Sequence, residues 1–566
     1  MDEQSDTGRQ RHILTVVLED YCHVGTVSRV VPPGYWHRFE SRVQRNTTLA
    51  LDLLDEVGAK ATFFALGWIA DNQPEVIAEV VRRGHEIASK GYFHRSIQDM
   101  SKEEFREDAL RSREALERAA GAPVRGYRIA RNYFSSRDLW ALDVLSEEGF
   151  DYDSSIRPLG LDFRDQPHRR FLHRQQWHDR VLWEVPLSSW KLGPFCIPIS
   201  GGNYVRQLPD AFVRRAVAQW DRSVDAPFVF YFHIWELDPD QPRITAVSPL
   251  QSIRQYRNLD TMAGKVRYYL DHYRFTSVAE HLALPPSELA IPRAKPDTFS
   301  PARIDADAER TPDVRRPITV VVPCYNEEAT LGYLANTLEC FADHVAGSYD
   351  VSYIFIDDGS RDATWERLNE LFGQRADCEL VRHPRNRGIA AATLTGFAHA
   401  KTEIICAIDA DGTYDPKQLK EMIAMLASDV DLVTASPYHE FGEVMNVPVW
   451  RLTLSKGASF LYRLVLRNKL ATYTSCFRVY RRTAVKDIVL KNQGFVGIVE
   501  ILSKLDMKGG RVVECPAVIE IRLLGHSKVK VLGTIAGHLK LLTQLPVERG
   551  LPGLYPKHSG RRGGIL

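Results

Sequence analysis

The chain has 566 residues, of which 44% are apolar and 26% charged, and its formal net charge is +1. A single hydrophobic core stops growing near ~250 to 300 residues, so this length predicts at least two domains. The near-neutral charge excludes a nucleic-acid footprint spread over the whole surface, and we expect no nucleic-acid partner.

Targeting signals are not visible in the sequence. Residues 1–11 contain no apolar segment typical of a signal peptide, and no run of about 20 apolar residues could span a bilayer. The eight cysteines are scattered without a Cys-x-x-Cys pair, as in reduced cytosolic proteins. We therefore expect a cytoplasmic protein, at most peripheral to the inner face of the membrane.

The first half alternates short apolar runs with amphipathic segments. Residues 12–18, 61–66 and 86–88 are typical of strands, and residues 47–57 and 74–83 are typical of helices. Alternation on this scale predicts a parallel barrel or a doubly wound sheet.

Five motifs in this half carry a family resemblance. They are AKATFF at 59–64, GHEIAS at 84–89, GYR at 126–128, DYDSS at 151–155 and YFHIWE at 231–236. Together they make residues 12–283 resemble the NodB-type polysaccharide deacetylases, which implies a distorted (β/α) barrel.

The resemblance implies a remnant of a catalytic site at six positions: Glu19, Asp20, Lys90, His94, Arg128 and His233. Lys90 stands where the family has its first metal-binding histidine, and Val17 stands where this branch carries an acid. A charged ammonium has no lone pair to offer a metal. We therefore expect a folded barrel that holds no metal and does not deacetylate.

Two interpretations of Lys90 remain open at this point. Its ammonium could take the place of the metal and pair with Glu19 or Asp20, or it could point into solvent.

Residues 284–316 lack hydrophobic periodicity and are rich in Pro, Asp, Arg and Ala. Such a segment buries too little apolar surface to fold alone. We predict a semi-extended tether between two separately folded domains.

The second half repeats one pattern three times. The apolar runs 318–322, 351–356 and 404–408 each stop in a polar turn, and Asp409 and Asp411 follow the last of them. Right-handed crossovers bring such strand ends to one side of a sheet, where ligands of α/β proteins bind. Taken alone, an Asp-x-Asp is more often a solvated turn. In this setting two carboxylates suit Mg²⁺ or Mn²⁺, with substrate phosphates completing the coordination.

Four ordered motifs give this half a second resemblance: PCYNEE at 323–328, DDGS at 357–360, HPRNRG at 383–388 and DAD at 409–411. They resemble the inverting family 2 glycosyltransferases, and within them the polyprenyl-phosphate sugar synthases. The implied fold for residues 317–528 is a GT-A (Rossmann-like) nucleotide-sugar domain, so both halves of the chain are α/β.

The resemblance also implies site residues. A nucleotide-sugar pocket is expected from Pro323, Tyr325, Glu327, Asp357 and Asp358. The metal and the sugar diphosphate are expected at Asp409 and Asp411.

The acceptor site is expected further along the chain. Arg451 and Ser455 are four residues apart, which places them on one face of a helix, and Arg478 follows in the segment 473–478. The resemblance implies that these three residues contact an acceptor phosphate, which is already anionic and needs no strong base.

Two departures from the family pattern leave the acceptor open: the segment 472–478 carries Thr472 and Cys476, and the segment 435–438 carries Ala435 and Pro437. With a sugar hydroxyl as acceptor an acid must act as base. The candidates are Glu440, Glu443 and Glu500.

The C-terminal segment 529–566 combines an amphipathic helix with a basic tail. The stripe from Lys528 to Leu545 ends at Pro546, and the glycine-rich residues 556–566 are expected to be disordered. The helix fits a membrane surface and equally fits packing on its own domain.

The sequence therefore predicts an inverting, metal-dependent glycosyltransferase joined to an inactive deacetylase-like barrel. It would move a sugar from a nucleotide-diphosphate donor to polyprenyl phosphate or a lipid-linked glycan in cell-surface polysaccharide synthesis. Two alternatives stay open: a bifunctional deacetylase and glycosyltransferase, or a barrel that binds glycan without catalysis.

Overall fold

The computed structural model describes residues 11–159, 163, 165–177, 180–285, 315–525 and 531–550. The chain divides near residue 303 into two compact units, and the short segments His37–Glu40 and Arg243–Ala246 group with the second. Each unit is described by itself. The predicted tether lies almost wholly outside the described residues, as does the predicted basic tail.

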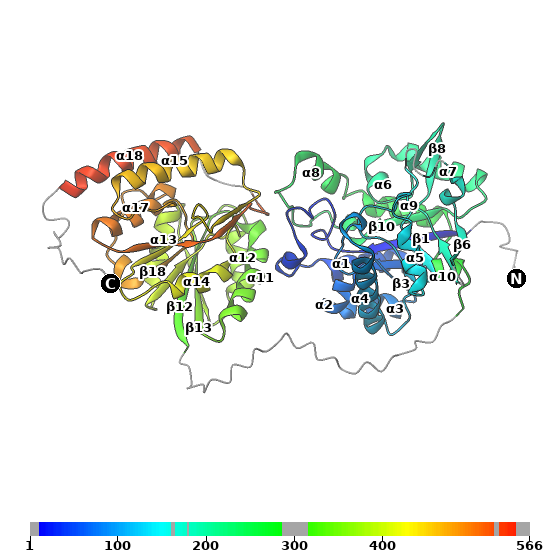
Figure 1. Cartoon of the computed structure of the whole chain (residues 1–566), viewed down its shortest axis with the longest axis horizontal. Helices are drawn as coiled ribbons and strands as arrows, with labels where there is room; N and C mark the ends of the chain where they lie inside the picture. Colours follow the sequence, from blue (N-terminus) through cyan, green and yellow to red (C-terminus); the bar gives the residue numbers. More distant parts are fainter. Residues whose placement is uncertain are drawn as a thin grey trace. The chain divides into compact units, whose positions relative to one another are not determined.

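The first unit is built on a largely parallel sheet (Figure 1). Among the described residues it has nine strands in the order β10-β1-β2-β3-β4-β5-β7-β6, with β11 beside β1. Only the β6–β7 pairing is antiparallel in this sheet. The strands are β1 (His12–Leu18), β2 (Thr62–Ala65), β3 (Glu86–Ser89), β4 (Gly126–Tyr127), β5 (Tyr152–Asp153), β6 (His173–Trp177), β7 (Arg180–Glu184), β10 (Val229–His233) and β11 (Phe275–Thr276). A separate hairpin joins β8 (Ser189–Leu192) and β9 (Phe195–Pro198).

Helices connect the strands, as the predicted alternation requires. They are α1 (Val43–Asp55), α2 (Gly67–Asn72), α3 (Pro74–Arg82), α4 (Lys102–Ala120), α5 (Trp140–Glu147), α6 (Asn203–Gln207), α7 (Asp210–Ser223), α8 (Pro249–Tyr256), α9 (Met262–His272) and α10 (Val278–His281). Short 3-10 helices lie at Pro33–Arg38, Ile97–Asp99, Pro167–Arg170 and Ile234–Leu237. The α4 helix begins at a capping box between Ser101 and Glu104 and ends at Gly121, whose positive φ suits glycine. The predicted parallel α/β fold of this half is confirmed.

The second unit contains a seven-stranded sheet in the order β14-β13-β12-β15-β18-β16-β19. Its strands are β12 (Arg316–Cys324), β13 (Tyr349–Asp357), β14 (Cys378–Arg382), β15 (Ile404–Ala407), β16 (Leu432–Ser436), β18 (Arg478–Arg481) and β19 (Val512–Pro516). All pairings are parallel except those of β18, which is antiparallel to both neighbours. A small parallel pair joins β17 (Glu443–Met445) and β20 (Val518–Glu520).

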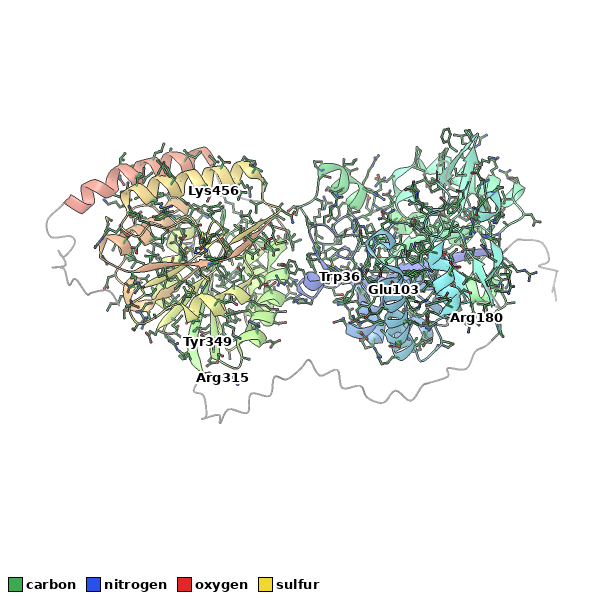
Figure 2. All side chains as sticks on the ribbon, viewed as in Figure 1. Trp36, Glu103, Arg180, Arg315, Tyr349 and Lys456 are labelled. Atoms are coloured by element: carbon green, nitrogen blue, oxygen red, sulfur yellow. The ribbon has the colours of Figure 1, made fainter. Side chains whose placement is uncertain are left out.

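Helices cover both faces of this sheet. They are α11 (Glu328–Val345), α12 (Thr364–Phe372), α13 (Ile389–His399), α14 (Leu419–Ala424), α15 (Val449–Val465), α16 (Arg482–Val485), α17 (Phe495–Met507) and α18 (Val531–Gly550), with a 3-10 turn at Pro416–Gln418. Successive side chains of β12 face opposite layers: Val320 and Val322 join the core with α11, and Val321 joins the core with α13 and α17. Figure 2 shows the side chains that fill these layers. This three-layer arrangement confirms the predicted Rossmann-like fold.

The α18 helix packs on its own unit against α15 and α17. Leu541 and Leu545 are buried there, and His538 Nδ1 lies 2.9 Å from the Tyr462 hydroxyl. The expected end at Pro546 is wrong, because the helix continues to Gly550. Within the described part of the chain, no helix is both long and apolar enough to cross a bilayer.

Candidate active site

Three parallel strands of the second unit deliver polar residues to one edge of the sheet. Cys324 at the end of β12 is level with Asp357 at the end of β13, and Val321 is level with Ala407 at the end of β15. The residues that follow these ends include Glu327, Asp358 and Asp409. The predicted gathering of acids therefore follows from the register of the sheet.

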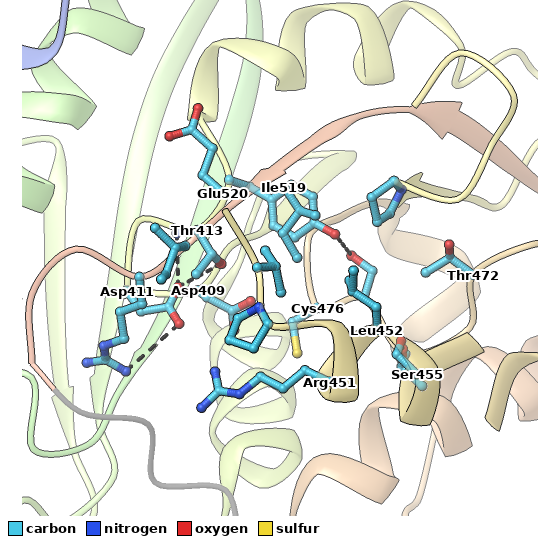
Figure 3. Close-up of a pocket in the computed structure, with 18 of the residues that line it drawn as sticks. Asp409, Asp411, Thr413, Arg451, Leu452, Ser455, Thr472, Cys476, Ile519 and Glu520 are labelled. Atoms are coloured by element: carbon cyan, nitrogen blue, oxygen red, sulfur yellow. Dashed lines mark hydrogen bonds and ion pairs between the residues drawn. The ribbon is translucent and has the colours of Figure 1, made fainter. Parts of the chain in front are cut away.

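A cavity of about 490 Å³ opens beside the two aspartates that follow β15 (Figure 3). It brings together four of the predicted site residues, Asp409, Asp411, Arg451 and Ser455, and it is also lined by Pro437, Thr472 and Cys476. The aspartates and the α15 residues line one continuous space, although more than 35 residues separate them in the chain.

Asp409 is the most perturbed acid of this cavity. Burial raises the pKa of Asp409 to about 7, and the negative charge of Asp411 is the second contribution to this increase. A hydrogen bond with the Cys476 thiol opposes this shift. The two carboxylates thus repel each other in a site that already disfavours charge.

Arg522 lies beside Asp411. One oxygen of Asp411 accepts hydrogen bonds from the Thr413 amide at 3.1 Å and its hydroxyl at 2.9 Å. The other oxygen is 3.9 Å from Arg522, whose guanidinium also pairs with Glu327. Arg522 therefore connects the end of β12 to the Asp-x-Asp turn.

These residues fit a divalent cation. Two carboxylates one residue apart offer hard oxygen donors, and a cation between them would relieve the repulsion that raises the pKa of Asp409. No cluster of three or more His, Cys, Asp or Glu with the geometry of a metal site occurs in the described ranges. Substrate phosphates and water would add further ligands.

The opposite end of the cavity is formed by α15. Ser455 Oγ lies 2.8 Å from Thr474 Oγ1. The guanidinium of Arg451 lies 5.3 Å from the ring centre of Trp450, and Arg451 forms no ion pair within the described part of the chain. An arginine without a carboxylate partner, beside two hydroxyls, suits an oxyanion.

A second hollow continues from this end. It has a volume of about 410 Å³ and shares Arg451, Ser455, Thr474 and Phe495 with the cavity. Its remaining walls are mostly apolar side chains of α15 and α18: Trp450, Leu454, Leu461, Ile535, Leu539 and Leu542. We call this hollow the α15–α18 groove.

The α15 helix also exposes apolar side chains beyond the groove. Val449, Phe460 and Leu464 are 76%, 63% and 66% exposed. Such side chains are uncommon together on one water-facing helix. The face of α15 therefore differs from an ordinary protein surface.

Several predicted residues do not line the cavity. Arg478 is fully buried and donates to the carbonyl oxygens of Tyr473 at 2.6 Å and Ile498 at 2.8 Å, so we withdraw it from the acceptor site. Glu500 is buried under hydrogen bonds from Lys491 and Asn492.

Glu440 and Glu443 are exposed residues that also lie outside the walls of the cavity. The acid that does line it besides the two aspartates is Glu520 at the end of β20, which the sequence did not reveal. Neither Glu520 nor Arg522 belongs to a recognisable motif, so no local signal marks them.

The residues expected to bind nucleotide lie along the same edge. Pro323 and Tyr325 are half-buried where β12 ends, and Asp357 is fully buried and accepts from the Ser360 amide at 2.9 Å. Asp358 holds the following loop, because it accepts from His383 Nδ1 at 2.7 Å and the Gly388 amide at 2.7 Å. Beside them a hollow of about 330 Å³ is lined by Gly359, Ser360, Arg382, His383 and Pro384.

The first unit has its own polar centre. Lys90 Nζ lies 2.6 Å from Glu19 Oε2, and the same carboxylate lies 3.2 Å from His94 and 3.6 Å from His233. Burial by itself would raise the pKa of Glu19, but Lys90 and the two imidazoles hold it well below its usual value. Of the two interpretations of Lys90, the structure supports pairing with Glu19.

Two remnant residues lie apart from this centre. Asp20 accepts from the Arg42 amide at 2.7 Å and the Tyr21 amide at 2.9 Å, and burial raises its pKa to about 6. Arg128 is buried against Phe64 and donates to Thr15 and Ser154. With an ammonium bonded to Glu19, the centre does not fit a catalytic divalent metal.

Comparison with known families agrees with this division. The profile of glycosyl transferase family 2 matches residues 319–489, that of polysaccharide deacetylase matches residues 34–149, and a domain of unknown function (DUF3473) matches residues 154–283.

Two curated relatives match the second unit. A dolichol-phosphate mannosyltransferase of Pyrococcus furiosus is 30% identical over 215 residues, which is 38% of this chain and 59% of that protein. A polyprenol monophosphomannose synthase of Mycolicibacterium smegmatis is 30% identical over 219 residues, which is 37% of this chain and 80% of that protein. Among solved structures, a glucosyl-3-phosphoglycerate synthase from Mycobacterium tuberculosis matches with 20% identity and a TM-score of 0.31, over 42% of this chain and 81% of that one.

Proposed function

Because the chain belongs to glycosyl transferase family 2 and carries a polysaccharide deacetylase domain, we propose that its second unit transfers a sugar from a nucleotide diphosphate to polyprenyl phosphate with inversion. The observation that carries this proposal is the continuity of the cavity with the α15–α18 groove. One end of this space offers acids, the middle offers Arg451 and Ser455, and the far end is apolar. A phosphate on a long hydrocarbon chain matches the last two features, and the names of the two curated relatives support the same acceptor class.

Asp409 and Asp411 would hold Mg²⁺ or Mn²⁺ at the donor end. The cation, when bound, would stabilise the negative charge that develops on the departing diphosphate. Arg522 lies beside Asp411 and adds a fixed positive charge to the same region. Glu327 orients Arg522 by pairing with it.

The acceptor phosphate would lie on Arg451 and Ser455. One of its oxygens forms a bond to the anomeric carbon of the sugar while the bond from that carbon to the diphosphate breaks. A single displacement of this kind inverts the anomeric centre. The acceptor oxygen is already anionic, so no protein base has to take a proton.

A sugar hydroxyl of a lipid-linked glycan is the second candidate acceptor, favoured by one observation. Glu520 lines the cavity and could take the hydroxyl proton, whereas Glu440, Glu443 and Glu500 do not line it. A requirement for Glu520 would separate this acceptor from a phosphate.

The test is nucleotide release by the purified chain with Mg²⁺ or Mn²⁺. A panel of UDP- and GDP-sugars is used with and without a short polyprenyl phosphate. We expect release that needs the lipid and that falls at least about 100-fold in Asp411→Ala. The matched control is Asp429→Ala, which removes an exposed aspartate paired with Arg511 outside the cavity. Nucleotide release at the same rate with and without the lipid would contradict the proposed acceptor.

We further propose that the second unit is cytoplasmic and binds peripherally to the inner face of the membrane. The exposed apolar residues of α15 would form the contact. Val449, Phe460 and Leu464 give this helix an apolar face, and Arg463 adds positive charge for anionic headgroups.

For the first unit we propose loss of deacetylation. Its Lys90–Glu19 pair supports this, because the ammonium neutralises the carboxylate and contributes no lone pair. Acetate release from N-acetylhexosamine oligomers, together with stoichiometric Zn²⁺ binding, would contradict the proposal and favour a bifunctional enzyme.

A further inference from the structure

The first unit contains a cavity of about 350 Å³ above the Lys90–Glu19 pair, and nothing in the transferase reaction uses it. All of its walls belong to the first unit. Its chemistry can therefore be considered by itself.

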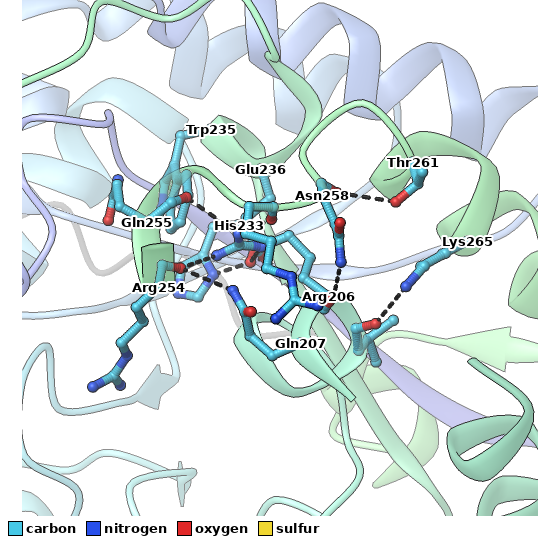
Figure 4. A network of polar contacts seen from close by, with 12 residues as sticks. Arg206, Gln207, His233, Trp235, Glu236, Arg254, Gln255, Asn258, Thr261 and Lys265 are labelled. Carbon is cyan, nitrogen blue, oxygen red and sulfur yellow. Dashed lines mark hydrogen bonds and ion pairs between the residues drawn. The ribbon is translucent and has the colours of Figure 1, made fainter. Parts of the chain in front are cut away.

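Two of the cations on its wall are already neutralised. Lys90 pairs with Glu19 at 2.6 Å. Arg206 pairs with Glu236 at 2.7 Å, with both side chains almost fully buried, and its other nitrogens donate to backbone carbonyls of the segment 254–257 (Figure 4). The two carboxylates that line the cavity are therefore both paired with cations.

Three further arginines line the same cavity: Arg131, Arg157 and Arg254. Within the described ranges none of them forms an ion pair with a carboxylate. The side chain of Arg254 points away from the Arg206–Glu236 pair (Figure 4). The cavity therefore carries an excess of positive charge, which favours an anionic ligand.

Arg157 is held in position rather than free to move. Its guanidinium lies 4.4 Å from the ring centre of Tyr133, and its NH1 group donates to the Tyr204 hydroxyl at 3.1 Å. Its Nε group is buried without a hydrogen-bond partner in the protein. A fixed guanidinium with an unused donor is suited to receive an oxyanion.

Aromatic side chains form another part of the wall. Tyr133, Tyr204 and Trp235 line the cavity, and the indole Nε1 of Trp235 is buried without a partner. Rings of this kind stack on the apolar faces of sugars, and an unused indole donor suits a sugar hydroxyl. Groups suited to a sugar and groups suited to an anion thus line one cavity.

We propose that this cavity binds a sugar that carries an oxyanion, a carboxylate or a phosphate, without altering it. The charged group lies on Arg131 and Arg157, and the sugar ring lies against the tyrosines and Trp235. The first unit would accordingly hold an acidic glycan. This inference does not depend on the reaction of the second unit.

Isothermal titration calorimetry of the full chain tests the proposal at about physiological salt. The probes are tri-galacturonate, its carboxyl-reduced neutral counterpart, galactose 1-phosphate and inorganic phosphate. We expect at least one charged sugar to bind at least about tenfold more tightly than the neutral trimer. Binding of tri-galacturonate or of galactose 1-phosphate identifies which anion is recognised.

Variants locate the binding. Arg157→Gln and Arg131→Gln are expected to weaken binding of the charged sugar at least about tenfold. Arg157→Lys, which keeps the charge but loses the planar fork, should also weaken it. The control Arg215→Gln removes an exposed arginine of α7 outside the cavity and should bind as the wild type does. Should Arg157→Gln fail to fold, as circular dichroism would reveal, the more exposed Arg254→Gln takes its place.

Three results would overturn the proposal: equal binding of the neutral trimer, no binding of either charged sugar, or equal binding by the Arg131 variant and the control. If inorganic phosphate binds as tightly as the charged sugars, the cavity recognises the anion alone. That result would overturn the proposed recognition of the sugar ring. Nucleotide release is measured on the same samples. Asp411→Ala should retain glycan binding, so failure of the transferase proposal and failure of this one give different results.

Discussion

The Lys90–Glu19 pair shows how one residue can set the chemistry of a buried polar centre. Both side chains are at least 95% buried, and each carries the charge that neutralises the other. Taking two charges out of water is costly, and the pair persists because the atoms meet at 2.6 Å. Its stability is therefore the property to test.

Removing only one partner should destabilise the first unit. Lys90→Met leaves Glu19 buried without its counter-charge, which typically costs ~3–5 kcal/mol. The double variant Glu19→Gln with Lys90→Met should lose much less, because no unpaired charge remains. Denaturant unfolding measures both, and Lys102→Met, which removes an exposed lysine, is the control. Equal stability of the single variant and the wild type would show that the ion pair does not form.

The same pair predicts a dependence of stability on pH. The folded-state pKa of Glu19 lies well below its ordinary value of 4.5. Its contribution to stability is thus fully present above pH 4.5 and is lost as the pH falls below that value towards the folded-state pKa. Unfolding free energies measured from pH 6 downwards should decline more steeply for the wild type than for the double variant. Parallel curves would contradict the assignment.

Sequence motifs marked some of the residues that line the cavity and missed others. Asp409, Asp411, Arg451 and Ser455 line one cavity because each follows a recognisable strand end or helix face. Arg478 also lay in a motif, but its strand turns the guanidinium into the core, where carbonyl oxygens bind it. Burial of this kind depends on packing that no short motif encodes.

At the scale of elements, α15 combines three roles. Its first turns supply Arg451 and Ser455 to the cavity, one side borders the α15–α18 groove, and Phe460 and Leu464 face outward. The outward side chains are separate from the walls of the groove. The proposed membrane attachment and the proposed acceptor binding can therefore be tested independently.

Replacing the outward side chains should weaken attachment to vesicles. Burial of a large apolar side chain contributes about 1.5–3 kcal/mol, so Phe460→Glu with Leu464→Glu should reduce co-sedimentation with anionic vesicles at least about tenfold. Leu250→Glu is the matched control, because Leu250 is 76% exposed on α8 of the first unit. An equal loss in the control, or none in the double variant, would exclude α15 as the attachment surface.

The α18 helix illustrates the limits of local rules. Its apolar stripe was visible in the sequence, and of the two uses predicted for it the structure shows packing on its own unit, where Leu541 and Leu545 are buried. Proline ordinarily ends a helix because it lacks an amide hydrogen. Here the helix passes Pro546 and reaches Gly550, so that rule gave the wrong end.

For the whole molecule, the class of each fold was predictable and the order of strands was not. Alternating strands and helices give parallel α/β layers by short-range connections. The antiparallel insertion of β18 between β15 and β16 depends on contacts between residues far apart in the chain. Likewise, only the folded sheet brings Arg522 to Asp411.

Two separate sets of cores predict two unfolding transitions. Among the described residues, two hydrophobic clusters of the first unit and two of the second share no residues. In scanning calorimetry, Mn²⁺ with a bound nucleotide sugar should raise the midpoint temperature of the second unit's transition by about 2–4 °C. The midpoint temperature of the first unit's transition should not change. Asp411→Ala should abolish that shift. A single transition that moves as a whole would show that the units unfold together.

The opening of the α15–α18 groove has a kinetic consequence. If the acceptor enters from the plane of a bilayer, the concentration that governs turnover is the number of polyprenyl phosphates per unit of membrane area. Adding inert phospholipid at constant acceptor then dilutes the substrate in two dimensions and slows the reaction, whereas adding buffer does not. Under the proposed function, a groove that joins the cavity at Arg451 and Ser455 would make turnover depend on the surface density of the acceptor.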